Sequence, residues 1–113
     1  MRVYIAGPYG DTNSDWKIQQ NVDRADETAR NVLAAGHNVF CPHKMTHRWE
    51  KDTRFTTQDF IDLDLSFISL WADCILRIPG ESKGADIEVD YARMLRLPIY
   101  DLADFPWSSC NRT

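Results

Sequence analysis

The chain has 113 residues, of which 43% are hydrophobic and 27% charged, a composition that favours one globular domain with a sizeable core. The net charge of −4, from 13 basic and 17 acidic side chains, disfavours a groove for polymeric nucleic acid but still allows a small anionic ligand. No apolar run approaches the roughly 18 residues of a membrane helix, and the first residues lack a signal-peptide pattern. We therefore expect a cytoplasmic protein with no membrane partner, whose three cysteines are reduced thiols.

Strand and helix patterns alternate along the chain. Residues 2–6 and 37–41 predict strands, and residues 14–36 between them predict an amphipathic helix that Ser14 or Asp15 caps and Gly36 ends. The expected core face of that helix is Trp16, Ile18, Val22, Ala25, Ala29, Val32 and Leu33. The polar segment 43–57 is expected to be irregular, at a length typical of functional loops.

The second half of the chain repeats the alternation. Residues 57–71 predict a helix, 73–79 a strand, 85–97 a helix and 98–102 a final strand. The expected packing residues are Phe60, Leu63, Phe67 and Leu70 in the first of these helices, and Ile87, Tyr91, Met94 and Leu95 in the second.

Strands that alternate with helices predict a parallel sheet covered on both faces. The expected fold over residues 1–113 is a small doubly wound α/β sandwich, Rossmann-like or flavodoxin-like, with three layers and a four- to five-stranded parallel sheet. Ligands bind beyond the carboxyl ends of the strands in such sheets. The turns at 7–11, 42–47 and 80–84 should therefore converge on one pocket.

The stretch "GESKGADIE" has the composition of a phosphate cradle. Gly80 and Gly84 allow several backbone N–H groups to face one side, and the following helix adds its positive end. Ser82 supplies a hydroxyl and Lys83 a possible countercharge. The alternative is an ordinary glycine-rich connection between a strand and a helix.

Carboxylates near this turn suggest glycosidic chemistry. Glu88 lies early in the helix, where the dipole favours the ionised form that a nucleophile or general base requires, although on position alone a surface glutamate that helps the helix start is the preferred interpretation. Asp62 and Asp64 lie on different sides of a helix, so at most one of them can complete the acid pair used in glycosidic cleavage. Tyr4 could orient a carboxylate, or simply fill the core as an aromatic residue.

The remaining candidates give weaker signals. Tyr9 lies in a turn, where it could stack on a base. His43 and His47 have i,i+4 spacing, but without an H-E-x-x-H pattern or a third ligand they are expected to form a pocket rim rather than a metal site. A G-x-S-x-G elbow and a P-loop are both absent from the sequence.

Four segments, "YIAGP", "NVFCPH", "DLSFISLWADCILRIPG" and "SKGADIEVDYA", occur in the order found in the nucleoside 2-deoxyribosyltransferase superfamily. The chain resembles this superfamily up to about Tyr100, and in particular its short bacterial and phage branch. It is also similar to the N-glycosidases that hydrolyse (deoxy)nucleoside 5′-monophosphates. The S-x-G-x-x-x-E pattern is more specific for this superfamily than the Y-I-A-G pattern is.

The resemblance implies roles for individual residues. Glu88 matches the catalytic glutamate that attacks or stabilises C1′ of the sugar, and Tyr4 matches the tyrosine that orients it. Asp64 matches the aspartate that protonates the departing base or binds the sugar, with Asp62 left open by a one-residue difference in spacing. The implied substrate-binding residues are Gly7, Tyr9, Ser82, Gly84, Lys83 and His43.

The chain also departs from the pattern of the monophosphate hydrolases. Their arginine-bearing G-S-x-R-G turn is "GPYGD" here, which leaves Lys83 as the nearby cation for a phosphate, while Ser82 still favours nucleotides over nucleosides. Family active sites are often completed by a neighbouring subunit's tail. The resemblance therefore implies a homo-oligomer, with "WSSCNRT" as the candidate tail.

The predicted function is cleavage of the N-glycosidic bond of a (deoxy)nucleoside 5′-monophosphate or nucleoside, by hydrolysis or base transfer, without a metal or organic cofactor. Glu88 would act as the nucleophile, Asp64 as the acid and Tyr4 as the orienting group. The alternative is a non-catalytic nucleotide-binding sensor or scaffold protein. A receiver-like signalling module is disfavoured, because only Asp11 follows the first strand.

Overall fold

The structure, a computed structural model, describes residues 1–10 and 14–108. Asp11, Cys110 and most of the tail predicted to complete a neighbouring site lie outside the described residues. No helix in the described part of the chain is long and apolar enough to cross a membrane.

The described residues form a four-stranded parallel sheet in the order β2-β1-β3-β4. The strands are β1 (Arg2–Ala6), β2 (Asn38–Phe40), β3 (Cys74–Arg77) and β4 (Ile99–Tyr100). The helices are α1 (Asp15–Ala34), α2 (Pro42–Thr46), α3 (Thr57–Leu70) and α4 (Lys83–Met94), with a 3₁₀ turn η1 (Trp49–Lys51). This order and alternation confirm the predicted doubly wound fold, with four strands rather than five.

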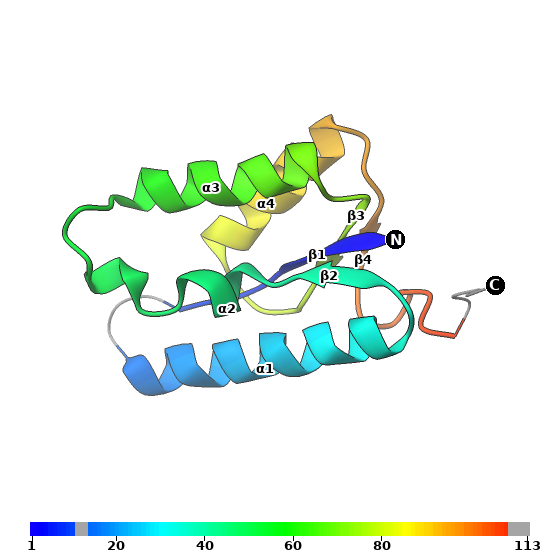
Figure 1. Cartoon of the computed structure of the whole chain (residues 1–113), viewed down its shortest axis with the longest axis horizontal. Coiled ribbons are helices and arrows are strands. Elements are labelled where there is room, and N and C mark those ends of the chain that lie inside the picture. The colour runs from blue at the N-terminus through cyan, green and yellow to red at the C-terminus, as the bar shows by residue number, and fades with distance from the viewer. Residues whose placement is uncertain (11–13, 109–113) are drawn as a thin grey trace.

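The sheet is the middle of three layers, with α1 below it and α3 and α4 above it in Figure 1. Val3 and Ile5 of β1 pack with Ala25, Ala29 and Val32 of α1. Tyr4 and Ala6, which alternate with them, pack on the opposite face with residues of α3 and α4. The strand therefore divides its side chains between two cores, as the period of two requires.

Local sequence signals explain where the helices begin. Ser14 rather than Asp15 caps α1, since its side chain accepts a hydrogen bond from the Lys17 N–H. Thr56 and Asp59 form a reciprocal capping box at the start of α3. The segment expected to be irregular contains α2 and η1, because Pro42 starts a short helix directly after β2.

The expected packing face of the helix after β3 is wrong at three of its four residues, since Tyr91 is partly buried against the core but Ile87, Met94 and Leu95 are not. Helix α4 buries Ala85, Glu88, Val89 and Ala92, which follow the i, i+3, i+4, i+7 spacing of one helix face. Met94 is 79% exposed, and Ile87 and Leu95 are exposed as well. The large apolar residues therefore indicated the wrong face of α4, because the face that is buried contains small residues and the charged residue Glu88.

The other helices show smaller departures. Trp16 and Leu33 of α1 are exposed, whereas the remaining residues of its predicted face are buried. In α3 the buried residue is Ile68, while Leu70 is 83% exposed. Cys74 is buried and Cys41 half-buried, and both are free thiols.

Candidate active site

A cavity of about 270 Å³ opens beyond the carboxyl end of the sheet, between the turn after β1, helix α2, helix α3 and the start of α4. This volume lies near the lower limit for small-molecule sites. Its lining is Gly7, Tyr9, Gly10, Ile18, Pro42, His43, Thr46, Glu50, Thr57, Phe60, Ile61, Asp64, Ser82, Gly84, Ala85 and Glu88. The turns after β1, β2 and β3 all contribute, as the fold prediction required.

A larger hollow of about 650 Å³ lies between α4 and the β4 edge. Its arginines are ion-paired, Arg77 to Asp86 at 3.2 Å and Arg93 to Asp90 at 3.7 Å. These paired charges are solvated structural contacts. The smaller cavity, in which the carboxyl groups of Glu88 and Asp64 have no ion-pair partner among the described residues, is therefore the better candidate site.

Glu88 lies at the base of the cavity and is 8% exposed. The Tyr4 phenol, completely buried in β1, donates a hydrogen bond to the Glu88 carboxyl. Burial, together with the nearby Asp64, raises the pKa of Glu88 to about 8, against the opposite effects of the Tyr4 hydrogen bond and of Arg77. Burial therefore outweighs the helix dipole that the sequence suggested would keep this group ionised.

Asp64 is the second carboxyl group of the site. It lines the cavity, and burial raises its pKa to about 7. Asp62 is exposed and accepts a hydrogen bond from Gln58, so it is Asp64 that faces Glu88.

The two carboxyl groups titrate as a pair near neutral pH. The Tyr4 phenol remains protonated, because burial raises its pKa well above the ordinary value. Its hydrogen bond stabilises the carboxylate form of Glu88, and no described residue donates a comparable bond to Asp64. Burial leaves the pKa of Glu88 above that of Asp64, but the Tyr4 hydrogen bond favours the alternative arrangement, in which the single proton lies on Asp64 and the negative charge on Glu88.

The turn before α4 forms another wall. Ser82 caps the helix by accepting a hydrogen bond from the Ala85 N–H at 3.0 Å, which leaves its hydroxyl hydrogen for a ligand. The first N–H groups of α4 have no partner inside the helix and point beyond its start. Lys83 is exposed and is not among the residues that line the cavity.

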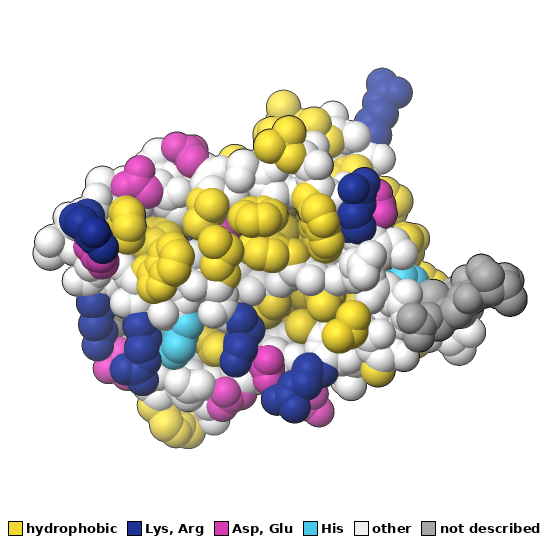
Figure 2. Space-filling model, in the orientation of Figure 1, with side chains coloured by type: hydrophobic (Ala, Val, Ile, Leu, Met, Phe, Trp, Pro, Cys, Tyr) yellow, Lys and Arg dark blue, Asp and Glu magenta, His cyan; other side chains and the backbone are white. Residues whose placement is uncertain are grey.

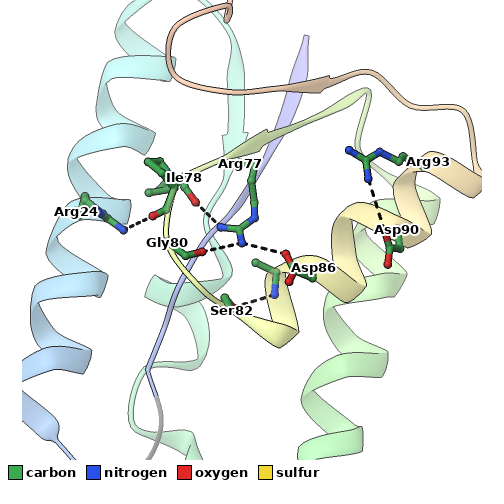
Figure 3. A network of polar contacts seen from close by, with 10 residues as sticks. Arg24, Arg77, Ile78, Gly80, Ser82, Asp86, Asp90 and Arg93 are labelled. Atoms are coloured by element: carbon green, nitrogen blue, oxygen red, sulfur yellow. Dashed lines mark hydrogen bonds and ion pairs between the residues drawn. The ribbon is translucent and has the colours of Figure 1, made fainter.

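Two arginines hold this turn from outside the cavity (Figure 3). Arg24 of α1 donates to the Pro79 carbonyl at 2.8 Å, and Arg77 of β3 donates to the carbonyls of Ile78 and Gly80. Gly80 has φ of 129°, and a Cβ there would lie 2.6 Å from Pro8 Cγ. The turn is thus locked against the β1–α1 connection.

The opposite wall is built around Tyr9. Its hydroxyl donates to Glu50 Oε2 at 2.9 Å and lies 3.1 Å from His47 Nδ1. Burial raises the pKa of Tyr9 to about 12, so the phenol keeps its hydrogen. His43 binds the Pro8 carbonyl through Nε2 at 2.9 Å, and burial lowers its pKa, so it is a neutral side chain that anchors α2 to the same connection.

The structure brings together most of the residues that the sequence suggested. Gly7, Tyr9, His43, Asp64, Ser82, Gly84 and Glu88 line one cavity, and Tyr4 lies directly behind Glu88. Thr46 belongs to the turn 42–47 that was expected at the pocket, whereas sequence reasoning missed Glu50, Thr57 and Ile61. Phe60 was identified, but as a core residue.

Among the described residues, no three His, Cys, Asp or Glu side chains are arranged to hold a metal ion. The two histidines of "PHKMTH" do not converge, since His43 binds Pro8 and His47 lies between Tyr9 and Gln19.

The fold and site define a doubly wound α/β protein with a buried carboxyl pair at the carboxyl end of its sheet. The family model described as "Domain of unknown function (DUF7768)" matches residues 1–102, so the chain belongs to that family. No curated protein matches it.

Among solved structures, the chain is similar to a 2-deoxyribosyltransferase from the psychrotolerant bacterium Bacillus psychrosaccharolyticus, described as a biocatalyst for the synthesis of antiviral and antitumoral nucleosides. The TM-score is 0.66 and the identity 19%, and the match covers 89% of this chain and 71% of the other. At this identity the likeness shows a shared fold.

Proposed function

We propose that the protein cleaves the N-glycosidic bond of a nucleoside or its 5′-monophosphate, as a member of the nucleoside 2-deoxyribosyltransferase superfamily. The observation that carries this proposal is the buried Glu88 carboxyl, held by the Tyr4 phenol at the base of a cavity that Asp64 also lines. The fold shared with a 2-deoxyribosyltransferase supports it.

In the first step, a Glu88 carboxylate oxygen forms a bond to C1′ of the sugar from the face opposite the base. The bond between C1′ and the base nitrogen breaks, and its electron pair leaves with the base. Asp64 transfers its proton to the departing base, as its raised pKa allows. The transition state has oxocarbenium character, which the negative charge of Glu88 stabilises.

In the second step, a water molecule or an acceptor base attacks C1′ and displaces Glu88. The Asp64 carboxylate takes the proton from the attacking group, which restores the starting state. Tyr4 holds Glu88 in one orientation throughout, so that the same oxygen faces the sugar.

The charge of the cavity bears on the choice between nucleoside and monophosphate. Its described lining contains three carboxyl groups, Glu50, Asp64 and Glu88, but no lysine or arginine. Among the residues that the structure describes, the groups that could hold a phosphate dianion are the first N–H groups of α4 and the Ser82 hydroxyl. We therefore expect nucleosides to react at least as fast as their monophosphates.

The test is release of free base, measured by chromatography, from the four common 2′-deoxynucleosides and their 5′-monophosphates. Each is incubated with and without a second base as acceptor, which separates hydrolysis from transfer. The proposal requires release from at least one compound by the native protein and its loss in Glu88→Ala. If the protein bound these compounds but released no base from any of them, a non-catalytic nucleotide-binding sensor would be favoured over an enzyme.

We also propose that the protein is a homo-oligomer. Apolar side chains gather in a band along α3 in Figure 2. Phe67 stacks on Phe40 at 3.9 Å between ring centroids, and the Trp71 ring meets Phe40 edge-on. Leu70, three residues after Phe67 on α3, is 83% exposed. Such a band is typical of an association surface. Light scattering should give a mass above 13.1 kDa, reduced by Leu70→Glu; a native mass equal to the monomer would contradict this.

A further inference from the structure

Three polar side chains lie together on the wall of the cavity formed by the β1–α1 connection and η1. The Tyr9 hydroxyl lies 2.9 Å from Glu50 Oε2 and 3.1 Å from His47 Nδ1. The backbone N–H of Arg48 donates to the same hydroxyl at 3.2 Å, and His47 Nε2 lies 3.2 Å from Gln19 Oε1. The mechanism proposed above uses none of these groups.

The hydrogen bonds of this cluster fix the Glu50 carboxylate as an acceptor. A phenol has one hydrogen, which Tyr9 donates to Glu50, so its oxygen accepts the bonds from Arg48 and His47. An ionised carboxylate accepts about four hydrogen bonds, and Tyr9 supplies one. Glu50 is therefore oriented by Tyr9 and retains acceptor capacity toward the cavity that it lines.

Glu50 lies where the proposed mechanism would place the base of a bound nucleoside. With C1′ at Glu88 and the 5′ side of the sugar at Ser82 and Gly84, the base lies toward the remaining lining. That lining includes the flat or apolar side chains of Tyr9, Phe60 and Ile61, which suit a stacked ring. Two carboxyl groups, Glu50 and Asp64, line the cavity at this end, and Glu50 is the one that the proposed reaction does not use.

Given the proposed function, we propose that Glu50 recognises the base and that the substrate carries a base with two adjacent N–H donors, as guanine does. The ring N1–H and exocyclic amine of guanine can both donate to one carboxylate. Adenine and cytosine place a ring acceptor beside their amine, which a carboxylate repels. Hypoxanthine, thymine and uracil offer one ring N–H beside carbonyl oxygens.

The test compares two ligands that differ by a single amine. Calorimetry measures the binding of 2′-deoxyguanosine and 2′-deoxyinosine to Glu88→Gln protein, which does not consume them. We expect 2′-deoxyguanosine to bind roughly 10- to 100-fold more tightly. Adding Glu50→Gln should bring the two affinities within about threefold, mainly by weakening 2′-deoxyguanosine, because the amide cannot accept both donors.

Glu27→Gln in the same Glu88→Gln background is the matched control, since Glu27 is exposed on α1 and far along the helix from the cavity lining. It should leave the ratio of affinities unchanged. Thermal melting of each variant shows that it is folded. Equal affinities for the two nucleosides, a ratio that Glu50→Gln does not reduce, or no binding of either would each overturn the inference.

Different results would refute the proposed function and the inference about Glu50. Native protein that releases no base from any nucleoside is not a glycosidase, yet a guanine preference that depends on Glu50 would still support base recognition. Release of base without preference for guanine leaves the glycosidase standing and overturns the inference.

Discussion

The two faces of the central strand bury different chemistry. Toward α1, β1 presents Val3 and Ile5 to a core that consists of apolar side chains. Toward α3 and α4, it presents Tyr4, whose phenol meets the buried carboxyl of Glu88. Residues that are neighbours in sequence thus contribute to a mainly apolar core on one side of the sheet and to a polar site on the other.

This difference separates stability from activity within one strand. Burying apolar side chains stabilises the fold, whereas burying an ionisable pair costs free energy that only hydrogen bonds and neighbouring charges offset. The α1 face should therefore govern unfolding, and the α4 face should govern the reaction. Substitutions on the two faces test that division.

The largest effect is expected for Glu88→Gln. The amide keeps the shape of the side chain and can still accept the Tyr4 hydrogen bond, but it cannot attack C1′. We expect kcat for base release to fall roughly 1,000-fold or more, while circular dichroism shows a native fold. Turnover within about tenfold of the native protein would remove Glu88 from the mechanism.

On the opposite face, Ile5→Ala should affect stability alone. Ile5 is completely buried among apolar neighbours, and its truncation leaves a cavity that costs about 3 kcal/mol of unfolding free energy. Urea unfolding measures this loss, and kcat per folded molecule should remain within about twofold. A large fall in kcat with an intact fold would show that the two faces are not independent.

Tyr4→Phe tests the positioning of Glu88 without removing it. The ring remains, but the hydrogen bond that stabilises the carboxylate is lost, so the pKa of Glu88 should rise. We expect kcat to fall about 10- to 100-fold and the acidic limb of the profile of kcat/KM against pH to move to higher pH. A fall in kcat with an unmoved limb would mean that Tyr4 acts only through packing.

The sequence predicted the alternation of strands and helices because each element carries a local pattern. β1 and β3 are short β-rich runs, α1 has a capping serine and a regular stripe of small and branched residues, and their order leaves few topologies. The meeting of the turns after β1, β2 and β3 at one cavity follows from the parallel sheet alone.

The finer features depend on contacts between distant segments. The face of α4 could not be read from its large apolar residues, because Glu88 is buried only through its bond to Tyr4, 84 positions earlier. Glu50 gave no signal, since η1 holds it in place through Tyr9 and no local motif marks such a contact. The raised pKa of Glu88 likewise reflects burial by several elements, which a helix position alone does not reveal.

The dependence of stability on pH provides a smaller test of the polar face. Burial raises the pKa of Glu88 from 4.5 to about 8, so the native state binds more protons than the unfolded state between these values. This contribution is fully present below about pH 4.5 and is lost as the pH rises through 8. Glu88→Gln should therefore match the native protein at pH 4 and be more stable than the native protein at pH 9, by up to roughly 1.4 kcal/mol for each unit by which folding raises the pKa of Glu88.

Urea unfolding of both proteins from pH 4 to pH 9 measures that difference. Equal stabilities at pH 9 would show that Glu88 ionises in the folded protein without penalty. That outcome would contradict a buried, proton-sharing pair at the base of the cavity.

The smallest effect is expected for Arg24→Ala, which removes a contact between α1 and the turn before α4. Arg24 is an exposed residue of α1 that makes one hydrogen bond to the Pro79 carbonyl, and Arg77 and the contact of Gly80 with Pro8 hold the same turn independently. Loss of one exposed hydrogen bond should lower the unfolding free energy by roughly 0.5 to 1 kcal/mol. KM should rise no more than about threefold and kcat should stay unchanged, because the groups proposed to react lie on β1, α3 and α4. A clear fall in kcat would mean that the position of this turn is transmitted to Glu88, and that the α1 face takes part in the reaction after all.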